Sequence, residues 1–525
     1  MNDEAFLRAP DPGRAGPDKD FFENDDAGFI KHRNGLLARL AAIEKDVGQW
    51  AYGPLCYLRV RMRVEALAKS YRPNRAVLVP DLFPCVGAGA PGELFFRAPL
   101  IHFRRLRHRI ASAEDHGETR RSRASGKVYH FVSRTRSEVG AIETIELAPV
   151  ELKRGFAATD AVAAMTDPRA ASGYIVELFE QQPLLASGDG DALGFRRAIT
   201  SLQNILLETG KGLSATLLPN PGGVPYIEVI LTTSPEPARL EDRRIVRSDA
   251  VLSAAPVRVD QNVARHESLL RRLAEHPLVR RIRFPVLIEA TNAQAGALSA
   301  PFPSPARVAD GRYPKVGVID TGIAIPFAGW VQHRHDFLAE ADCDPTHGTL
   351  VAGVLVAARL VNNSELGREE DGCDLVDIPL MPRVPFLSVY GQRGFEAFLE
   401  ELEAALTEAR DRFGVRVFNM SLNVTSPVDA DTYSIYAARL DEIQDRLGIV
   451  IVNSAGNLQS PDWRPAWPDK PAQVLAALAT RTSPDTIFMP CESVRAVAVG
   501  ALNPPGSSHI ERAPATYTRR GPGLR

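Results

Sequence analysis

The sequence predicts an α/β fold with a doubly wound parallel sheet in its C-terminal part, preceded by α+β domains. From about residue 314 onward, short continuous apolar segments alternate with amphipathic ones, as buried parallel strands alternate with helices. Residues 173–289 show the element order β-α-β-β-α-β, which is that of a ferredoxin-like unit. Residues 290–313 between these two parts are rich in Ala, Pro and Ser, so we expect an extended linker there.

The composition is that of a globular protein. The 525 residues include 62 Lys and Arg against 64 Asp and Glu, a formal net charge of −2, and 45% of them are hydrophobic. A length of this kind corresponds to about two to four domains. The sequence contains no run of about 18 apolar residues, which is the length that a membrane span requires, and the N-terminus lacks the apolar core of a signal peptide. We therefore expect a cytoplasmic protein that makes no use of a membrane.

The first 160 residues give no functional motif. Residues 1–30 mix Pro, Gly, Asp and Glu without periodicity, which predicts a flexible tail. Residues 31–160 combine leucines at helical spacing with a segment in which apolar residues and arginines alternate, which predicts an α+β domain of unknown role. Ten Lys and Arg lie between residues 104 and 136, but without a recognition motif we interpret them as a solvated loop or partner surface, and nucleic acid is not an expected partner.

The ferredoxin-like unit and the C-terminal domain are predicted element by element. In the first, strands are expected at 173–179, 212–218, 226–233 and 279–289, with helices around Phe195 and Leu269. In the domain at 314–525, the expected order is a strand at 315–320, helices at about 347–360 and 395–412, a strand at 415–422, a helix at about 431–446, and strands at 448–457 and 494–502. Functional side chains are expected where parallel strands end.

Asp320 ends the first of these strands and is followed by Thr321 and Gly322. An aspartic protease would need a second D-T-G or D-S-G, and the sequence contains none. In a serine protease a buried Asp orients a histidine, which requires a suitable histidine elsewhere. Alone, the triplet would equally fit an ordinary turn after a strand.

His347 is the histidine with the right context. It begins a helix whose first turns carry small residues, 27 positions after Asp320, and a general base near neutral pH is its natural role. His333 and His335 have no comparable context and are interpreted as structural, with a metal site beside Asp336 as the less favoured alternative.

Two further segments end strands at the same edge of the sheet. Asn457 follows a buried strand, and its carboxamide could donate to a developing oxyanion, although an Asn after Gly456 also suits a left-handed turn. The backbone of residues 419–422 could pair with an extended peptide.

From Tyr313 to Arg525 the sequence resembles the subtilisin-like serine proteases, or subtilases. The motifs VGVIDTGI, HGTLVAG, FNMSL and SAGN occur in the order of that family. The resemblance implies peptide-bond hydrolysis in which Asp320 orients His347, His347 acts as general base and then general acid, and Asn457 stabilises the oxyanion. It implies substrate contacts from the strand and loop motifs. We expect no metal site and no cofactor. The implied substrate-binding residues are Ser421, Leu422, Asn423, Ser454, Ala455 and Gly456.

The departures from the family pattern concern the nucleophile and the groove. The family's G-T-S-x-A-x-P motif does not occur in residues 1–525, so we expect the catalytic domain to stop before its serine, which would lie beyond residue 525. The alternative is an inactive pseudoprotease that binds peptides or a partner through the same groove. Leu350 stands where many members have a second His, and Asn423 stands where a Gly is common, which puts the substrate preference in question.

The resemblance also extends to regulation. Subtilase propeptides often have the ferredoxin-like fold predicted for 173–289, so we expect this unit to act as a built-in inhibitor or folding chaperone, with processing in the linker 290–313. Long bacterial subtilases without a leader look like cytoplasmic proteases that work with a companion ATPase. The expected partners are therefore a protein or peptide substrate and such an ATPase.

Overall fold

The computed structural model describes residues 18–521 with some exceptions. The exceptions are residues 24, 122–127, 180–190, 219–224, 243–257, 291–303, 309, 325, 362–369, 392–393, 429–432, 469, 471, 475, 477–484 and 504–508. The expected tail as far as residue 17 and most of the expected linker thus lie outside the described residues. The described residues fall into two compact units, one within Met1–Asp160, Tyr174–Arg247 and Asp260–Phe284, the other within Ala161–Gly173, Ser248–Val259 and Pro285–Arg525.

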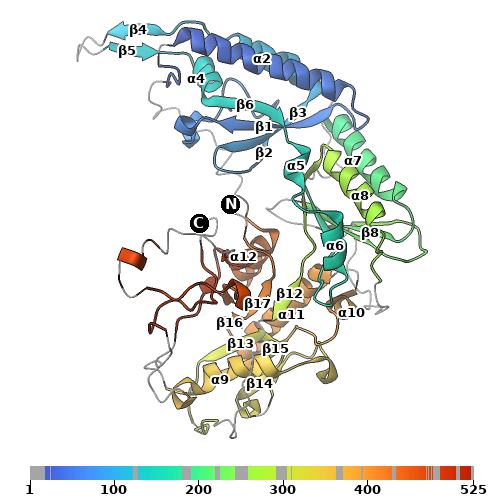
Figure 1. Ribbon diagram of the computed structural model, residues 1–525, viewed down its shortest axis with the longest axis vertical. Coiled ribbons are helices and arrows are strands. Elements are labelled where there is room, and N and C mark those ends of the chain that lie inside the picture. The colour runs from blue at the N-terminus through green and yellow to red at the C-terminus, as the bar shows by residue number, and fades with distance from the viewer. Residues whose placement is uncertain are drawn as a thin grey trace. The chain divides into compact units, whose positions relative to one another are not determined.

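The first unit begins with a long helix on an antiparallel sheet of order β2-β3-β1-β6 (Figure 1). These elements are α2 (Asp26–Gly48), β1 (Leu55–Met62), β2 (Cys85–Ala88), β3 (Glu93–Pro99), α3 (Phe103–Ala111), α4 (Arg134–Ala141) and β6 (Ile142–Leu147). Helix α2 begins at Asp26 because the Asp25 carboxylate caps it, accepting from the Gly28 amide. The prediction of a tail over residues 1–30 is therefore wrong for 26–30.

The second part of this unit has the predicted ferredoxin-like element order. Its sheet has the order β10-β8-β9-β7-β11, in which the four expected strands are joined by one additional edge strand. The elements are β7 (Tyr174–Leu178), α7 (Asp191–Glu208), β8 (Leu213–Leu218), β9 (Tyr226–Leu231), β10 (Arg239–Asp242), α8 (Val263–Glu275) and β11 (Val279–Arg283). Both parts belong to one compact unit, whereas the sequence suggested a boundary between 160 and 173.

The last predicted strand of this region, 279–289, is broken in two. β11 ends at Arg283, and a separate strand β12 (Ile288–Ala290) belongs to the second unit. Pro285 lies between them, and a proline has no N–H for a strand ladder. The prediction of one continuous strand is therefore wrong.

The second unit is built on a six-stranded parallel sheet of order β14-β15-β13-β16-β18-β19. Its elements are β13 (Lys315–Asp320), β14 (Val331–Arg334), α9 (Thr346–Val361), β15 (Asp374–Pro379), α10 (Phe386–Tyr390), α11 (Gly394–Phe413), β16 (Val417–Met420), β17 (Leu422–Val424), α12 (Ile435–Leu447), β18 (Val450–Ser454) and β19 (Val497–Val499). The α/β prediction is confirmed, and β14 and β15 are additions to the predicted list. None of the helices in the described ranges is long and apolar enough to cross a bilayer.

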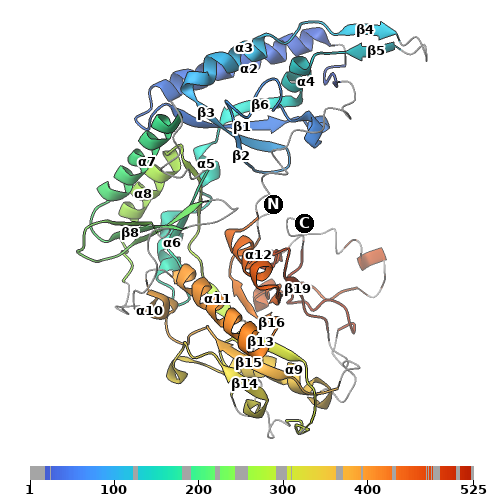
Figure 2. The same cartoon turned by 180° about the vertical axis from the view of Figure 1, so that it is seen from behind.

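Helices lie on both faces of this sheet. Val318 packs with α9 in one core cluster, and Met420, on the opposite face, lines a pocket together with residues of α11 and α12. Figure 1 shows α9 beside the strands of the sheet, and Figure 2 shows α11 and α12 from behind. The face that carries Val318 and Asp320 is only partly covered. By the register of the parallel pairs, this face also carries valines that are 40–49% exposed, namely Val417, Val450, Val497 and Val499. Parallel sheets are normally buried on both faces, so this part of the sheet has room for a further packed element.

Candidate active site

Asp320 and His347 form a hydrogen-bonded pair at the carboxyl end of the sheet. Asp320 ends β13 and is fully buried, and His347 lies in the first turn of α9. The His347 Nδ1 atom lies 2.7 Å from Asp320 Oδ1 and 2.9 Å from Oδ2. Because an ionised carboxylate only accepts, Nδ1 carries the proton and Nε2 holds the lone pair. Nε2 has no hydrogen-bond partner in the described part of the chain, so the imidazole can accept a proton there.

The backbone around this pair is locked by contacts between the D-T-G loop and α9. The Thr321 hydroxyl accepts from the Gly348 amide at 3.2 Å, and the Thr349 hydroxyl accepts from the Ala324 amide at 2.9 Å. Gly348 lies so close to the loop that a Cβ there would be 2.2 Å from the carbonyl oxygen of Gly322. Only glycine permits this approach, which explains the small residue directly after the histidine.

Asn457 lies at the same edge of the sheet, just beyond β18, which is two strands away from β13. Its main-chain oxygen accepts from Arg519 Nε at 3.1 Å, and Gly456 has a positive φ of 88° that turns the loop. The Arg519 guanidinium stacks on the Phe488 ring, 3.5 Å from its centroid. The half-buried side-chain amide of Asn457 has no partner within the described residues, so it is available to a ligand.

Arg519 was missed by reasoning from sequence. Burial lowers its pKa to about 10, and its contacts show that it supports the loop rather than facing solvent. The signal in the sequence is only the segment ATYTRRGPG, which contains no charge partner for the arginine.

The predicted substrate-binding residues of the SAGN loop use their backbone within the chain. The Ala455 amide donates to Val499, the Ala455 carbonyl accepts from Phe488, and the Gly456 carbonyl accepts from Arg519. The Ser454 hydroxyl accepts from the Gly456 amide at 3.1 Å. These groups shape the loop, which leaves the Asn457 side chain as its free polar group.

The predicted substrate strand is already paired with an extended segment of the same chain. β12 (Ile288–Ala290) is antiparallel to β17 (Leu422–Val424), with Glu289 opposite Asn423. The Thr425 amide donates to the Leu287 carbonyl at 2.9 Å and extends this pairing. The Ser421 hydroxyl donates to Asn419 Oδ1 at 3.0 Å. Residues 422–425 are thus paired within the chain, whereas the pairing of residues 419–422 with a substrate peptide stays a prediction.

Asn423 is buried rather than exposed in the groove. Its side-chain amide donates to the Ser454 carbonyl at 2.8 Å when the amide is oriented to satisfy both of its polar atoms. The residue therefore ties β17 to the end of β18. Its expected influence on substrate preference stays a prediction.

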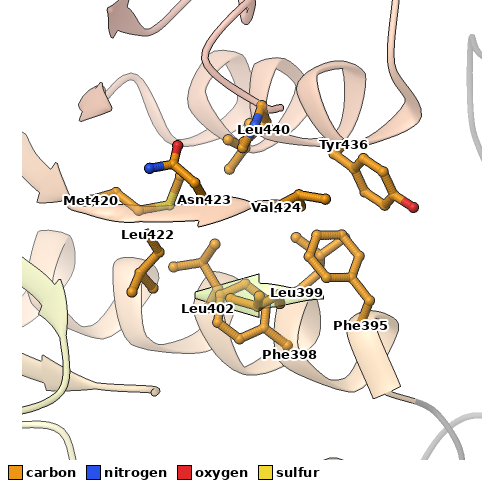
Figure 3. Close-up of a pocket in the computed structure, with 12 residues that line it drawn as sticks. Phe395, Phe398, Leu399, Leu402, Met420, Leu422, Asn423, Val424, Tyr436 and Leu440 are labelled. Atoms are coloured by element: carbon orange, nitrogen blue, oxygen red, sulfur yellow. The ribbon is translucent and has the colours of Figure 1, made fainter. Parts of the chain in front are cut away.

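An apolar pocket adjoins the β12–β17 pair. Phe398 and Leu402 of α11 lie below the strand in Figure 3, and Leu440 of α12 lies above it. Ile288 of β12 forms part of the wall and is only 3% exposed. The remaining lining residues are Phe395, Leu399, Met420, Leu422, Asn423, Val424, Tyr436 and Pro490.

A second buried carboxylate, Asp377 of β15, lies beside Asp320. It is 1% exposed, and it accepts from the Ile323 amide at 3.1 Å and from Arg334 Nη1 at 2.8 Å. Burial, with a contribution from the charge of Asp320, raises the pKa of Asp377 to about 6, against the opposing effect of Arg334. Sequence reasoning missed this residue, although an acid inside the apolar segment LVDIPL is a signal that a buried partner exists.

His333 and His335 lie elsewhere, as structural residues of the edge strand. His335 donates from Nδ1 to Glu408 at 2.9 Å and from Nε2 to Glu401 at 2.7 Å, and these carboxylates raise its pKa. His333 stacks on Phe413. Among the described residues, no group of three or more His, Cys, Asp or Glu is arranged to hold a metal ion.

Residues 311–525 match the family model of the subtilase family. Among solved structures, this chain is similar to the MycP3 protease from the type VII (ESX-3) secretion system, with 25% identity and a TM-score of 0.24 over 37% of this chain and 55% of that one. It is also similar to MycP1 with the N-terminal propeptide removed, with 20% identity and a TM-score of 0.23 over 40% of this chain and 61% of that one. A third similar structure is MycP1 from Mycobacterium smegmatis, with 18% identity and a TM-score of 0.24 over 40% of this chain and 55% of that one. The chain thus spans little more than half of these proteins. A comparison with curated proteins gave no match.

Proposed function

We propose, from the premise that residues 311–525 are a subtilase domain, that the protein is a serine endopeptidase of the subtilisin type. The observation that carries the proposal is the bond from His347 Nδ1 to Asp320, which leaves Nε2 free as a general base. In this role His347 takes the proton of a serine hydroxyl and returns it to the leaving amine, while Asp320 orients the imidazole. Asn457 donates its free amide to the oxyanion of the tetrahedral intermediate.

The proposal requires a serine at Nε2 of His347, and we assign this role to no residue of 1–525. The partly covered sheet face supports the proposal, because it lies on the same side as Asp320 and α9 and exposes valines at 40–49%. Leu350 and Val354 of α9 are exposed as well. We propose that a helix carrying the nucleophile packs on this face.

Labelling with a fluorophosphonate tests the proposal directly. The probe is applied to the 525-residue chain and to the product of the whole encoding gene, each with a His347→Ala variant and a matched His116→Ala variant. His116 is an exposed histidine that belongs to the other compact unit, so its removal should leave labelling intact. We expect labelling of the gene product that disappears only with His347→Ala. Absence of labelling from every form, even after cleavage in the expected linker 290–313, would refute the serine-protease mechanism.

We also propose that β12 acts as a built-in inhibitor. Its pairing with Leu422–Val424 uses the backbone that a peptide substrate would use, and it follows the ferredoxin-like unit directly in the chain. Replacing residues 294–300 by a recognition sequence for a sequence-specific protease allows the linker to be cut on demand. Fluorophosphonate labelling should rise after the cut, and equal labelling before it would contradict the inhibitor role.

The second candidate is a peptide-binding pseudoprotease. It is favoured by the same β12–β17 pairing, in which this edge already accepts an extended strand. A cut linker and a fluorescent peptide corresponding to residues 284–292 distinguish the two candidates. Binding that survives His347→Ala, with no labelling in any form, would establish the pseudoprotease.

A further inference from the structure

Three sets of hydrogen bonds fix the D-T-G loop that carries Asp320. One of these sets has no role in the proposed mechanism. α9 fixes Thr321 and Ala324 through the hydrogen bonds to Gly348 and Thr349. Main-chain amides of Leu380 and Met381, after β15, donate to the Asp320 carbonyl at 3.1 and 3.2 Å.

The third set of hydrogen bonds comes from the side chain of Asp377. Its Oδ2 atom accepts from the Ile323 amide, three residues after Asp320, and from Arg334 Nη1. Asp377 is opposite Val318 in the β13–β15 register, so it lies on the same face of the sheet as Asp320. A substitution at Asp377 therefore affects Asp320 in two ways: it alters the contact that fixes the loop, and it alters the electrostatic potential at the Asp320 carboxylate.

Arg334 balances the charge of Asp377. It ends the edge strand β14, its side chain is one-third exposed, and its Nη2 donates to Cys343 Sγ at 3.2 Å. The second carboxylate oxygen of Asp377, Oδ1, is buried without a hydrogen-bond partner in the described residues. When only one oxygen of a buried carboxylate is hydrogen-bonded, the stability of its charged form depends strongly on the neighbouring cation. The charged and titratable groups around it are Asp320, Arg334 and Cys343.

We propose that Asp377 and Arg334 are a positioning pair for the Asp320–His347 couple: the carboxylate anchors the loop at Ile323, and the guanidinium keeps the charge beside Asp320 balanced. This inference deepens the proposed function, on which it rests, by adding two residues that act through Asp320 and do not touch the substrate. The fully buried carboxylate of Asp320 supports His347 only if no uncompensated charge lies next to it.

The test follows the titration of the His347 ring by NMR, which requires no nucleophile. Asp377→Asn keeps an oxygen for the Ile323 amide but removes the negative charge, so Arg334 is left unbalanced. His347 should then titrate at lower pH, by about half a unit or more, since a charge acting through an intervening side chain shifts less than the roughly 1–3 units of a contacting one. Asp374→Asn, on the same strand but paired with Arg307, is the matched control and should leave the titration unchanged.

The double variant Asp377→Asn/Arg334→Gln separates charge balance from simple loss of structure. With both charges gone, the titration of His347 should return toward that of the unmodified chain, whereas damage to the loop would not be reversed. A midpoint that stays the same in all variants would overturn the proposal, and so would a double variant that shifts further than Asp377→Asn.

If Asp377→Asn does not fold, Arg334→Gln alone decides the matter. The Asp377 carboxyl should then titrate above its position in the unmodified chain, as seen in its carbon resonance, and an unchanged carboxyl resonance would overturn the pair. These readouts are independent of protease activity. Titration shifts without fluorophosphonate labelling would support the positioning pair and refute the proposed protease function. Labelling without titration shifts would support the protease function and refute the positioning pair.

Discussion

Truncation of Ile288 to alanine should release β12 from β17. The Ile288 side chain is 3% exposed and forms part of the apolar pocket wall. Removing a buried aliphatic side chain of this size costs about 3 kcal/mol through lost burial and the cavity that remains. Because β12 contains only the three residues Ile288–Ala290, most of this cost should fall on local docking rather than on the stability of the whole unit.

Amide hydrogen exchange measures this release. The Thr425 amide, which donates to the Leu287 carbonyl, should exchange roughly a hundredfold faster in Ile288→Ala, since about 1.4 kcal/mol corresponds to a factor of ten. Peptides covering β16 (Val417–Met420), in the middle of the parallel sheet, serve as the internal reference and should not change. The matched control is Val308→Ala, because Val308 is 65% exposed and its truncation opens no cavity. Unchanged exchange of the Thr425 amide would refute the view that Ile288 anchors the strand.

Three further predictions concern other sites. Gly348→Ala should lower the free energy of unfolding by about 1–3 kcal/mol, because its Cβ would lie 2.2 Å from the Gly322 oxygen. Gly329→Ala is the control and should leave the free energy of unfolding unchanged, because there is open space around Gly329. Equal urea midpoints for the two variants would contradict this prediction. His335→Gln should destabilise by about 1 kcal/mol at pH 5, and the difference should vanish as pH rises through the raised pKa of His335, because its stabilising contribution exists only while the imidazole is charged. Lys153→Met should raise stability more at pH 7 than at pH 10.5, because burial lowers the pKa of Lys153 to about 8 and the charged amine opposes folding; identical gains at both pH values would argue against this.

The elements predicted best were those with long, one-sided patterns. The predicted helix at 395–412 corresponds to α11 (Gly394–Phe413), and the strand at 315–320 corresponds to β13. The broken strand at 279–289 was not predicted, since Pro285 marks a possible break but not where the second piece will pair. β14 was missed because its sequence VQHR is mostly polar, and β15 was missed because Asp377 interrupts its apolar pattern; Arg334 at the end of β14 pairs with Asp377 in the fold.

The sequence by itself determined the α/β class of the C-terminal domain and pointed to Asp320 and His347, because each follows from local order: an acid at a strand end, and a histidine at the start of a helix of small residues. Tertiary structure decided what those residues contact. The pairing of β12 with β17, the support of the Asn457 loop by Arg519, and the Asp377–Arg334 pair near Asp320 join segments 43 to 136 residues apart. Such contacts depend on the register of strands and the closure of long loops, and neither is encoded in the periodicity of any one segment.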